Sequence, residues 1–164
     1  MNIKKRIQEA QARIIENLIA CEMSLAELYE TYSRTDSELS SFWKDIAVEE
    51  NNHATQLQSL LHLLEKGVIF KEIGRFDDAT IAPIVNLIKK EMEAIRQTPP
   101  SRTHALQIAL NLETSVFDAH FYDIVHADSP EYHAVASRLQ SETRTHIDII
   151  RKKILAAQEA HRAP

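Results

Sequence analysis

Apolar residues recur along this chain at alternating spacings of three and four, as in helices that bury one stripe of side chains. Five stretches carry this pattern, and polar or helix-breaking residues separate them. The sequence therefore predicts four long helices and one shorter helix, the third. Their approximate bounds are 2–33, 37–66, 78–97, 102–127 and 130–160.

The ends of these helices carry residues suited to capping. Asp36 or Ser37 can cap the second helix, and Gly67 is a natural residue just past its end. Ser101 can cap the fourth helix, and Pro130 suits the first position of the fifth. Two helices, a long connection with a short helix, and two more helices predict a single all-α domain over residues 1–164. Its expected architecture is an antiparallel four-helix bundle with a long crossover.

One glutamate interrupts the apolar stripe of each long helix. In two stripes a histidine follows one turn later, in Glu50-Asn-Asn-His53 and in Glu142-Thr-Arg-Thr-His146. Side chains three or four residues apart lie on the same face of a helix. The residues expected to meet inside the bundle are Glu22, Glu50, His53, Glu113, Glu142 and His146.

Four carboxylates in an apolar core need a compensating positive charge. A lone buried carboxylate is costly or becomes protonated, and grouped carboxylates also repel one another. Two divalent cations balance the charge of four glutamates, and neutral histidines add nitrogen ligands. The sequence therefore predicts the dinuclear, carboxylate-bridged site of di-iron or di-manganese bundles.

Each of these residues taken alone has a simpler interpretation. A single Glu-x-x-His on a long helix is usually a surface feature, and a histidine in an apolar stripe is usually a hydrogen-bonded core residue. We interpret His120 in the second way. The coincidence in four stripes favours metal binding. The acids expected to be merely solvated are Glu16, Glu27, Glu30, Glu49 and Glu91.

Composition narrows the choice of function. The 164 residues include only 2 glycines, which disfavours all-β folds and glycine-rich phosphate loops. The formal charge of −5 argues against nucleic-acid binding as the main task. A single cysteine, Cys21, excludes an intrachain disulfide and a site built from several cysteines. The sequence shows neither a signal peptide nor a membrane span, so a cytoplasmic location is expected.

The six residues, together with their neighbours, resemble the ferritin-like superfamily, and within it the rubrerythrin-like di-iron domains. The resemblance covers nearly the whole chain. It rests on Glu22 with Tyr29 seven residues later, the run 49–54, Glu113 and the four-residue step from Glu142 to His146. Aromatic residues follow Glu113, as they do in the family, at Phe117, Phe121 and Tyr122.

Two carboxylates that are common in rubrerythrins are absent here. Val116 and Thr145 stand in their places, so the ligand-exchange chemistry that depends on them is not expected. The remaining set is closer to the site of bacterioferritin and of oxygenase-like di-iron proteins, with four glutamates and two histidines. The rubredoxin module is also missing, because its iron needs four cysteines. Electrons would then come from a separate protein.

The resemblance implies a role for each ligand. Glu50 and Glu142 would bridge two iron ions, for which manganese or zinc are possible substitutes. Glu22 and Glu113 would each bind one ion terminally, and His53 and His146 would each add one nitrogen. Tyr29 is a candidate hydrogen-bond donor or redox-active phenol beside the site, with core packing as the alternative.

Three functions remain open at this point. The first is a rubrerythrin-like oxidoreductase that reduces hydrogen peroxide or dioxygen with electrons from an external protein. The second is a ferritin-like protein that oxidises and handles iron. The third is non-enzymatic: a bundle with a purely structural metal, or an interaction module. The resemblance also implies a homodimer.

Overall fold

The computed structural model describes residues 3–67, 72–73, 78–119, 125–126 and 130–162. Within these residues the fold is all-α, as the sequence predicts, with five helices and one pair of two-residue strands. The helices are α1 (Ile3–Thr35), α2 (Ser40–Glu65), α3 (Asp78–Gln97), α4 (Arg102–Asp118) and α5 (Pro130–Arg162). The strands are β1 (Glu72–Ile73) and β2 (Val125–His126). None of the described helices is long and apolar enough to cross a membrane.

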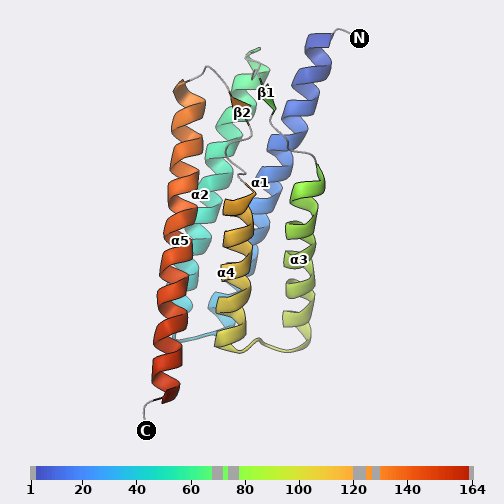
Figure 1. The fold of residues 1–164 in the computed structure, drawn as a ribbon. Coiled ribbons are helices and arrows are strands. Elements are labelled where there is room, and N and C mark those ends of the chain that lie inside the picture. Colours follow the sequence, from blue (N-terminus) through green and yellow to red (C-terminus); the bar gives the residue numbers. More distant parts are fainter. Residues whose placement is uncertain (1–2, 68–71, 74–77, 120–124, 127–129, 163–164) are drawn as a thin grey trace.

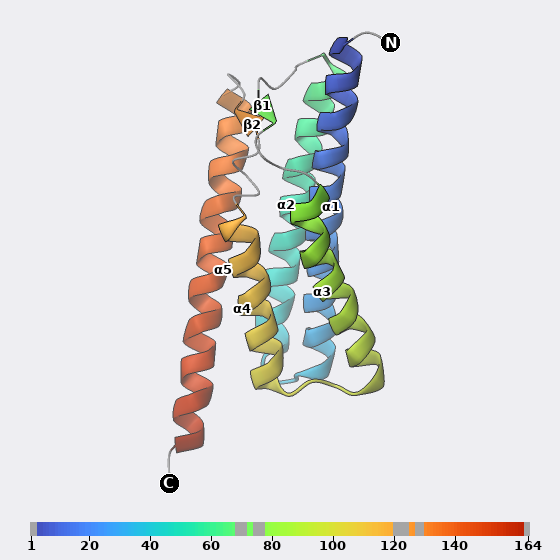
Figure 2. The ribbon, with the colours of Figure 1, turned by 45° about the vertical axis from the view of Figure 1, so that its right-hand side comes forward.

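The helices run side by side along one long axis (Figure 1). Helices α1 and α2 form an antiparallel pair with the most extensive packing in the molecule, and α4 and α5 form a second pair. Helix α3 packs mainly on α1, and α2 touches α5 over a shorter stretch (Figure 2). This arrangement surrounds a common interior with one face of each long helix.

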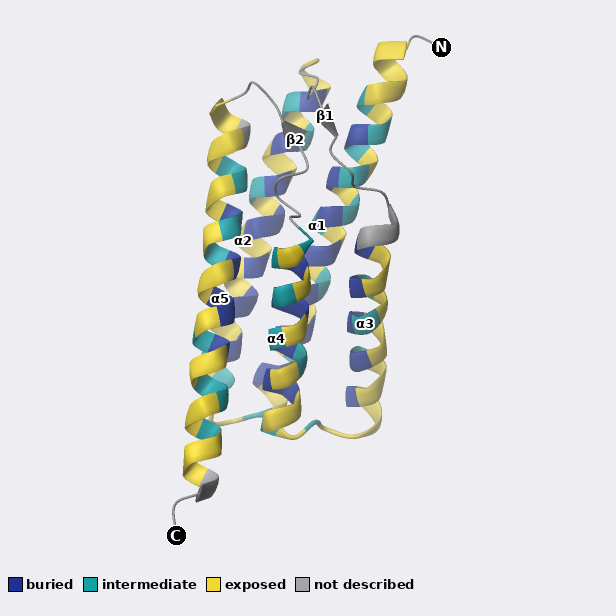
Figure 3. Cartoon of the chain, in the orientation of Figure 1, coloured by how far each residue is buried: buried dark blue, intermediate teal, exposed yellow. Residues whose placement is uncertain are grey.

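The core follows the apolar stripes. Buried residues lie on the sides of the helices that face one another, and exposed residues lie on the outward sides, most clearly on α3 (Figure 3). An aromatic cluster of Tyr29, Tyr32 and Trp43 lies between α1 and α2, with Trp43 stacked on Tyr29 at 5.7 Å between ring centroids. Burial of such large apolar surfaces is the main stabilising term of the fold.

Helix α4 ends at Asp118, about nine residues earlier than the sequence pattern predicts. The stretch that follows is rich in aromatic and β-branched residues, which favour extended backbone over helix. Its residues Val125–His126 pair antiparallel with Glu72–Ile73 of the α2–α3 connection. His120, Phe121 and Tyr122 lie outside the described residues.

Two of the predicted caps are present. Gly67 has φ of 89° and its N–H donates to the Leu64 carbonyl, so it ends α2 in the left-handed conformation that glycine favours. The Ser101 hydroxyl accepts from the His104 N–H at the start of α4. The prediction that Asp36 or Ser37 caps α2 is wrong, because α2 begins at Ser40 after Leu39 and has no side-chain cap; Asp36 instead caps the turn before the helix.

Asp36 also joins this turn to the start of α4. Its Oδ1 accepts from the backbone N–H groups of Glu38 and Leu39, and both carboxylate oxygens accept from the Arg102 guanidinium at 2.8 and 3.0 Å. The hydrogen bonds from Arg102 hold the pKa of Asp36 below its ordinary value. The contribution of this pair to stability is therefore present at neutral pH and is lost as the pH falls through that lowered pKa.

We expect Asp36→Ala to lower the free energy of unfolding by about 1–2 kcal/mol, because it removes both the cap and the ion pair. Asp36→Asn keeps the acceptor for the two N–H groups and should lose about half as much. Urea denaturation of the three proteins at neutral pH measures the difference. Equal losses for the two variants would mean that the cap contributes nothing.

Candidate metal centre

Three glutamates and two histidines from four helices meet in the buried interior. Glu22 comes from α1, Glu50 and His53 from α2, Glu113 from α4 and His146 from α5. All five are at most 1% exposed. Each lies in the apolar stripe of its helix, so the packing that buries the stripes also brings these polar groups together.

The five residues form two groups, each able to hold a metal ion, and Glu50 belongs to both. Its Oε2 lies 2.9 Å from His53 Nδ1, and its Oε1 lies 2.8 Å from His146 Nδ1. Glu22 Oε2 lies 3.8 Å from His53 Nδ1, and Glu113 Oε2 lies 3.5 Å from His146 Nδ1. Each oxygen of one carboxylate thus faces a different imidazole, which is the placement of a bridging ligand.

Glu50 and His146 lie close enough to share one cation. Glu50 Oε1 and His146 Nδ1 are buried and 2.8 Å apart, and neither atom is in a well-aligned hydrogen bond. Two ligand atoms at about 2.1 Å from one ion, at right angles, would be about 3 Å apart. Oxygen and nitrogen ligands together suit iron, manganese or zinc.

Protons replace cations in the metal-free protein. Burial raises the pKa of Glu50, and the charge of Glu113 raises it further. Burial lowers the pKa of His53, but the carboxylates of Glu22 and Glu50 outweigh it and raise the pKa to about 10. At His146 burial also lowers the pKa, and Glu113 and Glu50 raise it to about 12. At neutral pH the metal-free site therefore holds protons that a metal ion would displace.

Two half-exposed glutamates bind the outer edges of the histidine rings. Glu142 Oε2 lies 3.1 Å from His53 Nε2, and Glu49 Oε2 contacts His146 Nε2. Each glutamate reaches across from the opposite helix, α5 or α2. An acceptor at Nε2 fixes the imidazole orientation and leaves Nδ1 as the ligand atom.

Tyr29 contacts the centre from a third side. Its hydroxyl donates to Glu113 Oε1 at 2.7 Å, and both groups are fully buried. Burial, followed by the charge of Glu113, raises the pKa of Tyr29 well above its ordinary value. The hydroxyl thus stays protonated and holds the carboxylate in place.

The structure places Glu142 differently from the expected bridge. Its side chain is 41% exposed and lies at the outer edge of His53, outside both groups of candidate ligands. The residue that α5 turns inward beside His146 is Thr143, which is 1% exposed. The sequence analysis expected Glu49 to be merely solvated; its side chain is 51% exposed, but it also contacts His146 Nε2. The sequence does contain a hint of this role for Glu49. It directly precedes Glu50, so it lies at the edge of the helix face that carries Glu50.

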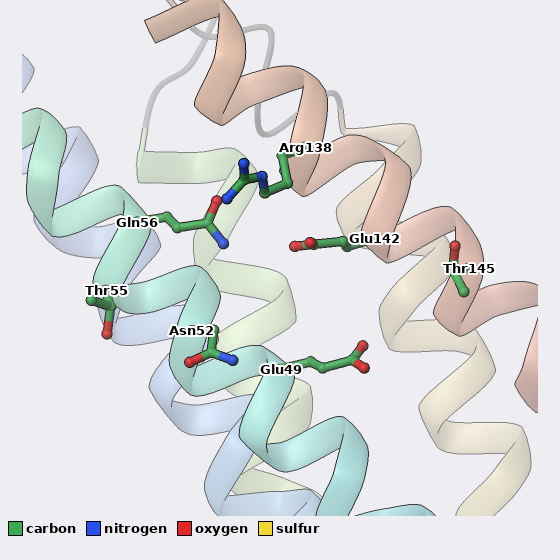
Figure 4. A pocket seen from close by; sticks show the side chains of 7 residues that line it. All are labelled: Glu49, Asn52, Thr55, Gln56, Arg138, Glu142 and Thr145. Atoms are coloured by element: carbon green, nitrogen blue, oxygen red, sulfur yellow. The ribbon is translucent and has the colours of Figure 1, made fainter. Parts of the chain in front are cut away.

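A polar cavity of about 600 Å³ opens beside the histidines, between α2 and α5. Figure 4 shows Glu49 and Asn52 of α2 facing Glu142 of α5 across this space, with Gln56 and Arg138 approaching each other. Glu49 and Glu142 line this cavity and also contact the histidines, so these two side chains lie between the cavity and the imidazole rings of the candidate ligands.

The positions of Glu49 and Glu142 predict paired effects on metal affinity. We expect Glu142→Gln to weaken binding at the His53 group, and Glu49→Gln at the His146 group, each by about 10–100-fold. Stepwise titration with cobalt(II) measures both sites in each variant, and Glu27→Gln on the exposed face of α1 is the control. Loss of both ions in Glu142→Gln would instead make Glu142 a bridging ligand.

Comparison with known proteins gives no match: no family model matches this chain, no curated protein matches it, and no solved structure matches it. The functional argument therefore rests on the residues and their geometry.

Proposed function

We propose that this protein is a non-haem di-iron carboxylate oxidoreductase that reduces hydrogen peroxide or dioxygen. The observation that carries the proposal is the position of Glu50, a buried carboxylate whose two oxygens face the Nδ1 atoms of His53 and His146 at 2.9 and 2.8 Å. A structural ion needs one closed set of ligands. A bridge between two incomplete sets suits a pair of ions that act together.

The proposal includes the ferritin-like fold. Helices α1, α2, α4 and α5 would be the four helices of the bundle, and α3 would belong to the long crossover between α2 and α4. The two antiparallel pairs, and the origin of the candidate ligands in these four helices, support this assignment. Such bundles place dinuclear centres where inward-facing residues of all four helices meet.

Each residue around the centre has a defined task in this proposal. Glu22 and His53 would hold one ion, Glu113 and His146 the other, and Glu50 both. When bound, an iron pair supplies two electrons together, as reduction of peroxide to water requires. The surrounding apolar residues keep bulk water from the centre, and Tyr29 fixes Glu113 through its hydrogen bond.

The electrons would come from a separate electron-transfer protein. The single cysteine of this chain, Cys21, is buried and cannot build a sulfur-ligated iron site by itself. Our proposal further includes a cytoplasmic homodimer that binds neither nucleic acid nor membrane, in keeping with the formal charge of −5.

Anaerobic loading with ferrous ion, followed by mixing with peroxide or with dioxygen, tests the function. We expect about two ions per chain and oxidation of both by one equivalent of peroxide. The matched control is Glu91→Gln, another buried acid (6% exposed) that lies away from the centre between Tyr32 and His104. Loaded protein that reacts with neither oxidant would contradict the proposal.

A further inference from the structure

The candidate ligands are closed off from solvent. All five are at most 1% exposed, and apolar residues of the surrounding helices pack around them. A metal ion from solution can reach them only by passing between helices, and a metal site requires such an entry path. The ion therefore needs a place where two helices leave room for it.

The cavity between α2 and α5 provides this room. Its volume of about 600 Å³ far exceeds the roughly 30 Å³ that one water molecule takes up, so a divalent ion fits with its shell of water. Glu49 and Glu142 line the cavity from opposite helices (Figure 4). Each of them also contacts Nε2 of a candidate ligand, His146 and His53 respectively. These two side chains separate an ion in the cavity from the imidazole rings.

Both glutamates combine the charge and the mobility that an entry gate needs. Their side chains are 51% and 41% exposed, so part of each faces the cavity although its carboxylate contacts a buried ring. Exposed side chains change rotamer within nanoseconds, and carboxylates that line a polar space attract cations. The amide oxygen of Gln56, on the same cavity wall as Glu49, is buried and makes no hydrogen bond with the described residues. It can therefore replace a water around an ion in transit.

We propose that divalent cations enter the centre through the cavity between α2 and α5, and that Glu49 and Glu142 are the movable gate between this cavity and the ligands. Rotation of either side chain away from its histidine would uncover the ring edge and let the ion move on. This inference rests on the proposed dinuclear centre and adds the path by which its ions arrive. Because the gate lies outside both groups of candidate ligands, blocking the cavity should change the rates of metal binding but not its equilibrium.

Stopped-flow mixing with cobalt(II), followed by release of the ion to excess chelator, tests this inference. Asn52→Trp fills part of the cavity with a large ring. We expect it to slow uptake and release alike by at least about tenfold, with an unchanged dissociation constant, because an obstructed path raises the barrier in both directions. The matched control is Gln58→Trp, which puts the same ring at an exposed position of α2 that is not among the residues lining the cavity. Its rates should equal those of the parent protein.

A change of charge on the cavity wall should have the opposite effect. Arg138 is the one positively charged side chain among the residues that line the cavity. Arg138→Gln should accelerate uptake several-fold at low ionic strength, and the gain should shrink as salt screens the cavity. Thr145→Trp blocks the cavity from α5 if Asn52→Trp does not fold.

Parental rates in the two blocked variants would overturn the inference. Slower uptake that weaker affinity explains in full would also overturn it, as would uptake by Arg138→Gln that is no faster than in the parent protein. Failure of the parent protein to bind two ions would instead overturn the proposed function.

Discussion

Replacing Glu50 with alanine is expected to abolish both metal sites at once. Glu50 is the one residue common to the two groups of candidate ligands, with one oxygen directed at each histidine. Outer partners of metal ligands typically change affinity by about 10–100-fold, so loss of a shared direct ligand should exceed about a hundredfold at each site. Elemental analysis after dialysis against a fixed concentration of manganese(II) measures the loss.

Single-site variants give the contrast that makes this result specific. Glu22→Ala should weaken only the site with His53, and Glu113→Ala only the site with His146, because each acid belongs to one group. Glu91→Gln should bind two ions as the parent does. If Glu50→Ala retained one ion at full affinity, Glu50 would be a ligand of a single site and the centre would not be bridged.

Metal binding should strengthen steeply with pH. His53 and His146 have raised pKa values in the metal-free protein, and the pKa of Glu50 is also raised by burial. All three must lose their protons to bind metal. Three protons released for two ions are about 1.5 per ion, so the affinity per ion at about pH 6 should be about a thousandfold lower than at about pH 8.

The stability of the protein should show the same linkage. Histidines with raised pKa values stabilise the folded metal-free chain below the pKa of about 6.5 that they have when unfolded, and this contribution is lost as the pH rises through the folded values. At high pH the folded state also opposes ionisation of the buried Glu50, which lowers the stability of the metal-free protein further. The rise in melting temperature on adding excess manganese(II) should therefore be larger at high pH.

Scanning calorimetry with and without metal measures this increment, and calorimetric titration in buffers of different ionisation enthalpy counts the protons. The Glu50→Ala variant provides the baseline, because it should show no metal-dependent increment at any pH. If metal raised the melting temperature equally at about pH 6 and about pH 8, the site would already be deprotonated before metal binds.

Helical periodicity predicts the buried position of five site residues but leaves the inward-facing residue of α5 undecided. It brings Glu22, Glu50, His53, Glu113 and His146 to buried positions because each lies three or four residues from large apolar neighbours on the same stripe. On α5 the stripe is ambiguous, since positions 142 and 143 both lie within one turn of His146. A rotation of the helix by a fraction of a turn decides between them, and the packing of α5 on α4 sets that rotation.

The prediction that Glu91 is merely solvated is wrong, although Glu91 lies in the apolar stripe of α3, three residues after Ile88 and four before Ile95. Glu91 is 6% exposed because Tyr32 donates to one of its oxygens and His104 contacts the other. These partners come from α1 and α4, so only the docking of α3 beside α1 reveals them. Such hydrogen bonds compensate for burial of the carboxylate.

Local spacing along each helix was enough to predict the all-α fold, the order of the helices and the presence of buried acids and histidines. Which groups face one another depends on how the helices pack: the shared carboxylate of Glu50, the outer positions of Glu49 and Glu142, and the uncharged Thr143 three residues before His146. Local spacing fixes only the face of a helix. The rotation and depth of each helix, which decide contact at atomic distance, depend on all the neighbours that pack against it.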